Sequence, residues 1–150
     1  MTNHLRRATP DDAAAIRVLV RAAYAKWVPI MGREPTPMLA DYDLAVRHHI
    51  VDLLLTDDEL TAVIELVVEP ECVLIENVAV RPERAGRGHG RFLMVHAVEV
   101  ARSQGRKRLR LYTNRLMAEN IALYQRLGYA IDREEVTRDG RHLVHMSLVI

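Results

Sequence analysis

The segment E-N-V-A-V-R-P-E-R-A-G-R-G-H-G-R-F-L, which runs from Glu76 to Leu93, is the most informative stretch of the chain. It begins with the apolar pattern of a strand and ends with the start of an apolar helix pattern. Between the two stand three alternate glycines, Gly86, Gly88 and Gly90. Glycine adopts backbone angles closed to other residues and lets another group approach the backbone closely. The pattern therefore predicts a strand, a tight glycine turn and a helix in direct succession.

The predicted glycine turn is a candidate anion site. Several N–H groups point outward at a helix N-terminus, where the helix dipole is positive, so a phosphate group fits there. Arg84, Arg87 and Arg91 would add positive charge. The alternative reading is a flexible turn that holds no ligand. A P-loop is excluded because Gly90 is followed by Arg91 and Phe92 instead of Lys and Ser or Thr, and the spacing is not that of a dinucleotide-binding fingerprint.

Helices and strands flank this segment on both sides. We expect helices at residues 13–27, 39–49, 89–104 and 117–127, with a proline-rich loop at 29–37. We expect strands at residues 5–8, 50–56, 60–68, 72–80, 108–113, 129–136 and 142–150. The order βααβββαβαββ predicts an α/β (α+β) protein, in which a mixed, mostly antiparallel central sheet has helices on both faces.

Length and composition exclude several classes of protein. The 150 residues are 49% hydrophobic and 27% charged, which predicts one globular domain over residues 1–150. The net charge of +1 argues against general nucleic-acid binding. The single cysteine, Cys72, excludes an intrachain disulfide. There is no apolar run of membrane-spanning length and no segment of signal-peptide type, so we expect a cytoplasmic protein with neither membrane nor nucleic acid as partner.

The segment around the glycine turn resembles the acetyl-CoA motif of the GNAT N-acetyltransferase superfamily. A second stretch, from Asn120 to Tyr129, resembles that family's second motif, and the order of elements fits over essentially the whole chain. The resemblance implies a sheet splayed between two parallel strands, at 72–80 and 108–113, with acetyl-CoA as co-substrate. It implies acetyl transfer to a primary amine of a small molecule or peptide. A sensor or assembly module that binds acetyl-CoA without catalysis is the alternative, and a homodimer is compatible with the resemblance.

The resemblance also assigns the coenzyme contacts. The backbones of Val78 and Val80 would bond to the pantetheine arm, and the amides from Gly86 to Arg91 would hold the pyrophosphate. The complete predicted set is Val78, Ala79, Val80, Ala85, Gly86, Arg87, Gly88, His89, Gly90, Arg91, Asn114 and Asn120. Ala85 departs from the family motif, which usually has Gln or Arg there. His89 would either touch phosphate or be solvated.

Acetyl transfer to an amine requires a group that accepts a proton and a group that supplies one. By the resemblance, Tyr124 is the general acid that approaches the coenzyme sulfur; its alternative role is a core tyrosine. Asn120 and Met117 lie on the same helical stripe, but Met117 stands where the family often has Asn, so Asn114 is a second candidate for a coenzyme contact. Glu76 is the candidate base, with a solvent-facing or salt-bridged glutamate as the alternative.

Acceptor recognition is expected in and beside the proline-rich loop, because loops on a rigid frame commonly shape sites. The predicted substrate-binding residues are Trp27, Arg33, Asp41 and Tyr42. Arg33 would meet a carboxylate of the substrate and Asp41 an amine, whereas Trp27 has packing against the sheet as its alternative. No metal is expected, since the histidines and the lone cysteine lack a zinc-ligand spacing.

Overall fold

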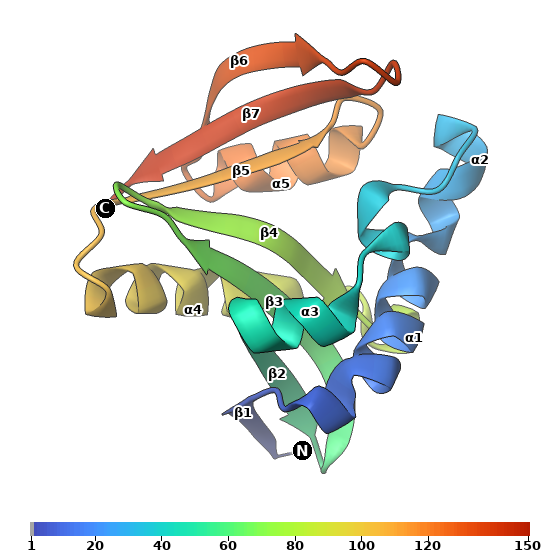
Figure 1. Ribbon diagram of the computed structural model, residues 1–150, viewed down its shortest axis with the longest axis vertical. Coiled ribbons are helices and arrows are strands. Elements are labelled where there is room, and N and C mark those ends of the chain that lie inside the picture. Colours follow the sequence, from blue (N-terminus) through green and yellow to red (C-terminus); the bar gives the residue numbers. More distant parts are fainter. Residues whose placement is uncertain (1) are drawn as a thin grey trace.

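The computed structural model, drawn in Figure 1, describes residues 2–150. Its centre is a seven-stranded sheet in the order β1-β2-β3-β4-β5-β7-β6. The strands are β1 (Asn3–Arg7), β2 (Ile50–Thr56), β3 (Glu59–Val68), β4 (Val73–Val80), β5 (Arg108–Asn114), β6 (Ala130–Val136) and β7 (His142–Val149). The helices are α1 (Ala13–Tyr24), α2 (Val28–Met31), α3 (Tyr42–His48), α4 (His89–Ser103) and α5 (Ala118–Arg126), with short 3₁₀ helices η1 (Pro10–Asp12), η2 (Ala25–Trp27), η3 (Thr36–Leu39) and η4 (Pro82–Arg84).

The sheet is antiparallel except between β4 and β5, which run parallel. That parallel pair is joined at only two register positions, Val73 with Leu109 and Leu74 with Arg110. Beyond these positions the two strands diverge, as Figure 1 shows. The expected fold class, a mixed sheet splayed between two parallel strands, is confirmed.

Helices cover both faces of the sheet, as the sequence predicts. On one face, Ile16 and Val20 of α1 pack with Leu53 and Val63 of the sheet. On the other face, α4 and α5 contribute to a second core, whose members from the sheet include Ile64. Successive strand residues point to opposite faces, so adjacent positions such as Val63 and Ile64 serve different cores. No helix among residues 2–150 is long and apolar enough to cross a membrane.

The first helical region extends further than the sequence predicts. We expected its end near Trp27 and a loop at 29–37, but the chain continues through η2 into α2 and stops at Gly32, whose φ is 73°. Pro29 stands in the first turn of α2. A proline there breaks no helical hydrogen bond, because the first N–H groups of a helix have no partner within it. The prediction of a loop throughout 29–37 is therefore wrong.

The next helix begins later than expected. The predicted start was residue 39, but Leu39 belongs to η3 and α3 starts at Tyr42. The side chain of Asp41 accepts a hydrogen bond from the amide of Leu44 at 3.1 Å and so caps the helix. An N-cap aspartate fixes a helix start in this way. Most other element ends lie within a residue or two of the predicted positions.

An ion pair links the end of β3 to β5 at the point where β4 and β5 are still paired. Glu69, just beyond β3, accepts two hydrogen bonds from the guanidinium of Arg110 on β5, at 2.6 and 2.7 Å. The backbone carbonyl of Glu69 also accepts a hydrogen bond from Arg106 at 2.8 Å. Arg110 is paired in register with Leu74, so this fork lies where β4 and β5 are still joined. Hydrogen bonding from Arg110 lowers the pKa of the Glu69 carboxyl.

We expect Glu69→Gln to lower the free energy of unfolding by about 1–2 kcal/mol at pH 7, because it removes a bidentate, charge-assisted pair. The folded-state pKa of Glu69 lies below its unfolded value, so its contribution is complete above that value of roughly 4.3 and is lost as pH falls through the folded pKa. Urea denaturation from pH 3 to pH 7 measures this. Glu99→Gln, which breaks an exposed pair on α4, is the matched control with little effect. Equal effects of the two variants at pH 7 would contradict the role of the fork.

Candidate active site

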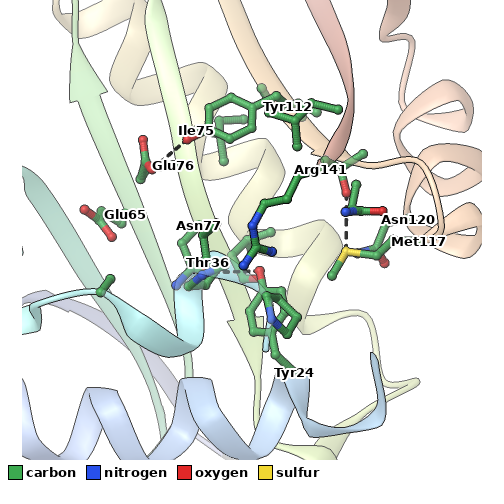
Figure 2. Close-up of a pocket in the computed structure, with 18 of the residues that line it drawn as sticks. Tyr24, Thr36, Glu65, Ile75, Glu76, Asn77, Tyr112, Met117, Asn120 and Arg141 are labelled. Atoms are coloured by element: carbon green, nitrogen blue, oxygen red, sulfur yellow. Dashed lines mark hydrogen bonds between the residues drawn. The ribbon is translucent and has the colours of Figure 1, made fainter. Parts of the chain in front are cut away.

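A cavity of about 830 Å³ lies beside the diverging strands (Figure 2). Residues 75–78 of β4 and 111–114 of β5 line it together. The rest of its wall comes from α1, α2, α3, α5, β3, β6, β7, the β6–β7 hairpin and the segment around η3. Since β4 and β5 are unpaired along this stretch, the sheet itself leaves the opening between them.

The glycine turn precedes α4, as predicted. Gly88 is the N-cap of α4 with φ of 84°, and Gly86 has φ of 76°, so both need the left-handed region that glycine tolerates. A methyl group on either would meet nothing within 4 Å, which leaves the space above the turn open. Within residues 2–150, no group accepts a hydrogen bond from the amides of residues 86–91. The turn thus presents outward N–H groups at a helix N-terminus, as an anion site requires.

The side chains around the turn differ in their exposure. Arg87 and Arg91 are exposed, while Arg84 pairs with Glu59 at 3.3 Å. His89 is 8% exposed, and its Nε2 is buried without a hydrogen-bond partner. The solvated alternative for His89 is therefore wrong: this position in the first turn of α4 faces the interior.

Tyr124 lines the cavity from α5. Its side chain is buried, and burial raises the pKa of its phenol to about 12. The hydroxyl is consequently protonated throughout the neutral range. The hydroxyl is not among the fully buried atoms that lack a partner within residues 2–150, so it reaches the cavity and can donate its proton to a ligand.

Glu76 lines the cavity from β4 and accepts a hydrogen bond from the hydroxyl of Tyr112 at 3.1 Å (Figure 2). Burial, together with the charge of Glu76, raises the pKa of Tyr112 to about 12. Tyr112 therefore stays a hydrogen-bond donor to Glu76 at neutral pH. This bond holds the carboxylate at the opening between β4 and β5.

A hydrogen-bond network fixes the wall opposite β5. The hydroxyl of Tyr24 lies 2.8 Å from Asn77 Oδ1 and 3.3 Å from the carbonyl oxygen of Val78. Asn77 Nδ2 donates to the hydroxyl of Tyr42 at 3.1 Å, which in turn donates to the carbonyl of Pro37 at 2.6 Å. The network connects α1, β4, α3 and the segment around η3, so it holds that wall in one arrangement.

Sequence reasoning missed a buried pair in this cavity. Glu65 of β3 is 5% exposed, and its Oε2 lies 2.6 Å from Nδ1 of His49. Burial outweighs the hydrogen bond from His49 and raises the pKa of the Glu65 carboxyl. One signal was available, because a glutamate inside the apolar run A-V-I-E-L-V-V is unusual unless it has a partner or a function.

The structure brings only part of the predicted acceptor set to the cavity. Tyr42 and Asp41 line it. Trp27 is 5% exposed and is not among the lining residues. Arg33 donates to the carbonyl oxygen of Asp139 at 2.7 Å and joins its loop to the β6–β7 hairpin. Their roles toward a substrate remain predictions.

Both asparagines proposed for the coenzyme line the cavity. Asn114 ends β5, and its Oδ1 accepts a hydrogen bond from the amide of Leu116 at 2.9 Å. Asn120 contacts the sulfur of Met117 with its Nδ2 at 3.7 Å (Figure 2). In the part of the chain from residue 2 onward, no group of three or more His, Cys, Asp or Glu side chains is placed to hold a metal ion.

Comparisons with known proteins agree with this geometry. A family model described as the acetyltransferase (GNAT) family matches residues 13–129. Streptothricin acetyltransferase from Streptomyces lavendulae is 35% identical over 80 residues, which are 49% of this chain and 42% of that protein. The chain therefore matches less than half the length of this relative.

Solved structures show the same fold. A ribosomal-protein-S18-alanine N-acetyltransferase from Escherichia coli has a TM-score of 0.80 at 22% identity, covering 99% of this chain and 94% of its own. The PaiA N-acetyltransferase from Thermoplasma acidophilum, solved with coenzyme A, has a TM-score of 0.81 at 16% identity and covers 100% of both chains.

The buried Nε2 of His89, which has no hydrogen-bond partner, leads to a stability prediction. His89→Leu removes an unsatisfied polar atom and keeps an apolar group in its place, so we expect the free energy of unfolding to rise by about 1 kcal/mol. Urea denaturation at pH 7 measures it. His4→Leu, at an exposed position of β1, is the control and should change stability by less than about 0.5 kcal/mol. A loss of stability in His89→Leu would mean that the imidazole is paired in solution.

Proposed function

The chain belongs to the GNAT acetyltransferase family, and from that premise we propose that it transfers the acetyl group of acetyl-CoA to a primary amine of a small molecule or peptide. One observation carries the proposal. An open glycine turn with unpaired amides precedes α4, and the cavity between β4 and β5 holds both a carboxylate and a protonated phenol.

The residues present fit the coenzyme. The amides of residues 86–91 would hold its pyrophosphate, with Arg87 and Arg91 exposed beside them. The absence of the usual Gln or Arg at Ala85 matters little when backbone N–H groups bind the phosphates. Val78 would bond to the pantetheine arm, which is supported by its place in the cavity lining, on a stretch of β4 that is not paired with β5.

Each proton of the reaction has a candidate residue. Glu76 would accept a proton from the substrate ammonium, directly or through water, and free the nitrogen lone pair. The amine nitrogen then forms a bond to the thioester carbonyl carbon, the carbon–sulfur bond breaks, and the nitrogen releases its second proton to solvent. Tyr124 would donate its proton to the departing sulfur and regain one from solvent. The Val78 amide would polarise the thioester carbonyl.

The relatives suggest which acceptors to test first. The curated relative is named for streptothricin and one structural relative for the alanine of a ribosomal protein. We propose both a small-molecule amine and a peptide amine as acceptor classes. A module that binds acetyl-CoA without catalysis would bind the coenzyme in a calorimetric titration but release no thiol with streptothricin, alkyl amines or an alanine-terminated peptide.

Tyr124→Phe should lower kcat by about 10²–10⁴-fold, because the departing sulfur loses its proton donor, while coenzyme affinity stays nearly unchanged. Thiol release and calorimetry measure the two quantities with the best of these acceptors.

Tyr129→Phe is the matched control. Tyr129 is buried with an unpaired hydroxyl, its ring centroid is 6.2 Å from that of Tyr124, and it is not among the lining residues. This variant should keep full activity. Unchanged turnover in Tyr124→Phe would remove Tyr124 from the mechanism.

Glu76→Gln should lower kcat/KM by about 10²–10⁴-fold at pH 7, since the amide cannot accept the proton of the ammonium. The deficit should shrink as pH rises toward the acceptor's own pKa, about 10.4 for a lysine-like amine, because the free amine then needs no base. Glu71→Gln, in the exposed turn before β4, is the control. A deficit that is constant with pH would contradict a role as base and leave Glu76 a binding group.

A further inference from the structure

The cavity is strongly acidic. Its lining includes the five carboxylates of Asp41, Glu65, Glu76, Glu135 and Asp139, against one arginine and no lysine within residues 2–150. That arginine, Arg141, donates to Asp139 at 3.1 Å and to the carbonyl of Glu34 at 3.0 Å. Glu135 is held by His145 at 2.8 Å. Glu65 and Glu76 therefore have no arginine or lysine beside them, which favours a ligand that brings positive charge.

Glu65 has an unused oxygen in this cavity. Its Oε2 is occupied by His49, but its Oε1 has no hydrogen-bond partner in the described part of the chain. The residue is more than nine-tenths buried. Oε1 is not among the fully buried atoms that lack a partner, so it reaches the cavity and can accept a hydrogen bond from a ligand there. An ammonium or guanidinium group supplies both the missing donor and the missing charge.

The two carboxylates stand side by side. Glu65 on β3 is in register with Asn77 on β4, which follows Glu76. A bulge between Glu65 and Leu66 shifts the pairing at this point. The charge of Glu76 contributes to the raised pKa of the Glu65 carboxyl, so the two carboxylates are close enough to interact electrostatically. Figure 2 shows both on adjacent strands beside the pocket.

Aromatic rings complete the surroundings. Four of the five tyrosines, Tyr24, Tyr42, Tyr112 and Tyr124, line the cavity. The faces of aromatic rings attract ammonium groups electrostatically. The rings therefore add to the preference of the cavity for a positively charged ligand.

We propose that the acceptor carries a second cationic group a few carbon atoms from its reacting amine. Glu65 binds this second group, while Glu76 accepts the proton of the reacting amine. The acceptor class is thus a diamine, or an amine with a guanidinium. This inference rests on the proposed acetyl transfer. His49 acts as a positioning residue, because its hydrogen bond fixes Oε2 and leaves Oε1 for the ligand.

The test compares diaminobutane with butylamine, which differ only in the second ammonium group. The unmodified protein should acetylate diaminobutane with at least a tenfold higher kcat/KM, measured by thiol release. Glu65→Gln keeps the shape of the side chain and should raise KM for diaminobutane about tenfold or more while leaving kcat/KM for butylamine unchanged. Glu65→Asp keeps the charge and should retain part of the preference.

Controls separate folding from recognition. Calorimetric titration with coenzyme A should give the same affinity for the Glu65 variants as for the unmodified protein, which shows that they are folded. Glu99→Gln, on the exposed face of α4, should keep the full preference for diaminobutane.

The experiment distinguishes failure of this inference from failure of the proposed acetyl transfer. Equal use of the two amines by the unmodified protein, or an equal loss for both in Glu65→Gln, would overturn this inference and leave acetyl transfer intact. Coenzyme binding without thiol release from either amine, from streptothricin or from an alanine-terminated peptide would overturn the proposed function, and this inference with it.

Discussion

The rest of the structure depends on how early the pairing of β4 and β5 ends. After two register positions the strands part, and β4 beyond Leu74 is not paired with a strand on that side. Unpaired backbone groups inside a protein are costly, so such a gap persists only where something else fills it or holds it open. The Glu69–Arg110 fork closes one end, and the Tyr24–Asn77–Tyr42 network holds the wall at the other. The gap is thus an opening that specific side-chain contacts maintain. The glycine turn follows β4, the strand that borders this opening.

The sequence allowed prediction of this region because each of its parts leaves a local signal. A strand pattern, three alternate glycines and a helix pattern stand in immediate succession, and Gly86 and Gly88 do adopt positive φ. Residues 25–41 were harder, because Pro29 can end a helix or begin one, and only tertiary contacts decide between them. One such contact is Arg21 of α1, which donates to the carbonyl of Met38 at 2.8 Å and holds η3 against the helix.

The cavity was predicted less completely for a related reason. Tyr124 and Glu76 lie in motifs, but the Glu65–His49 pair joins two segments that only the pairing of β2 with β3 brings together. The bulge beside Glu65 changes which side chains share a surface, and strand alternation alone does not reveal a bulge. His89 shows the converse error: a polar residue in a glycine-rich turn suggested exposure, yet the first turn of α4 directs it inward.

The two parts of the site have opposite electrostatic preferences although the chain carries a net charge of only +1. At the turn, unpaired amides, the positive end of the α4 dipole and exposed arginines favour an anion. In the cavity, the lining carboxylates of the described residues outnumber the single lining arginine, so the cavity disfavours an anion. In the proposed reaction, the turn would attract the anionic coenzyme and the cavity would repel it, whereas a cationic acceptor would experience the reverse. The glycine turn follows β4, which borders the gap, so these two preferences would orient the reactants with the thioester and the amine meeting near Glu76 and Tyr124.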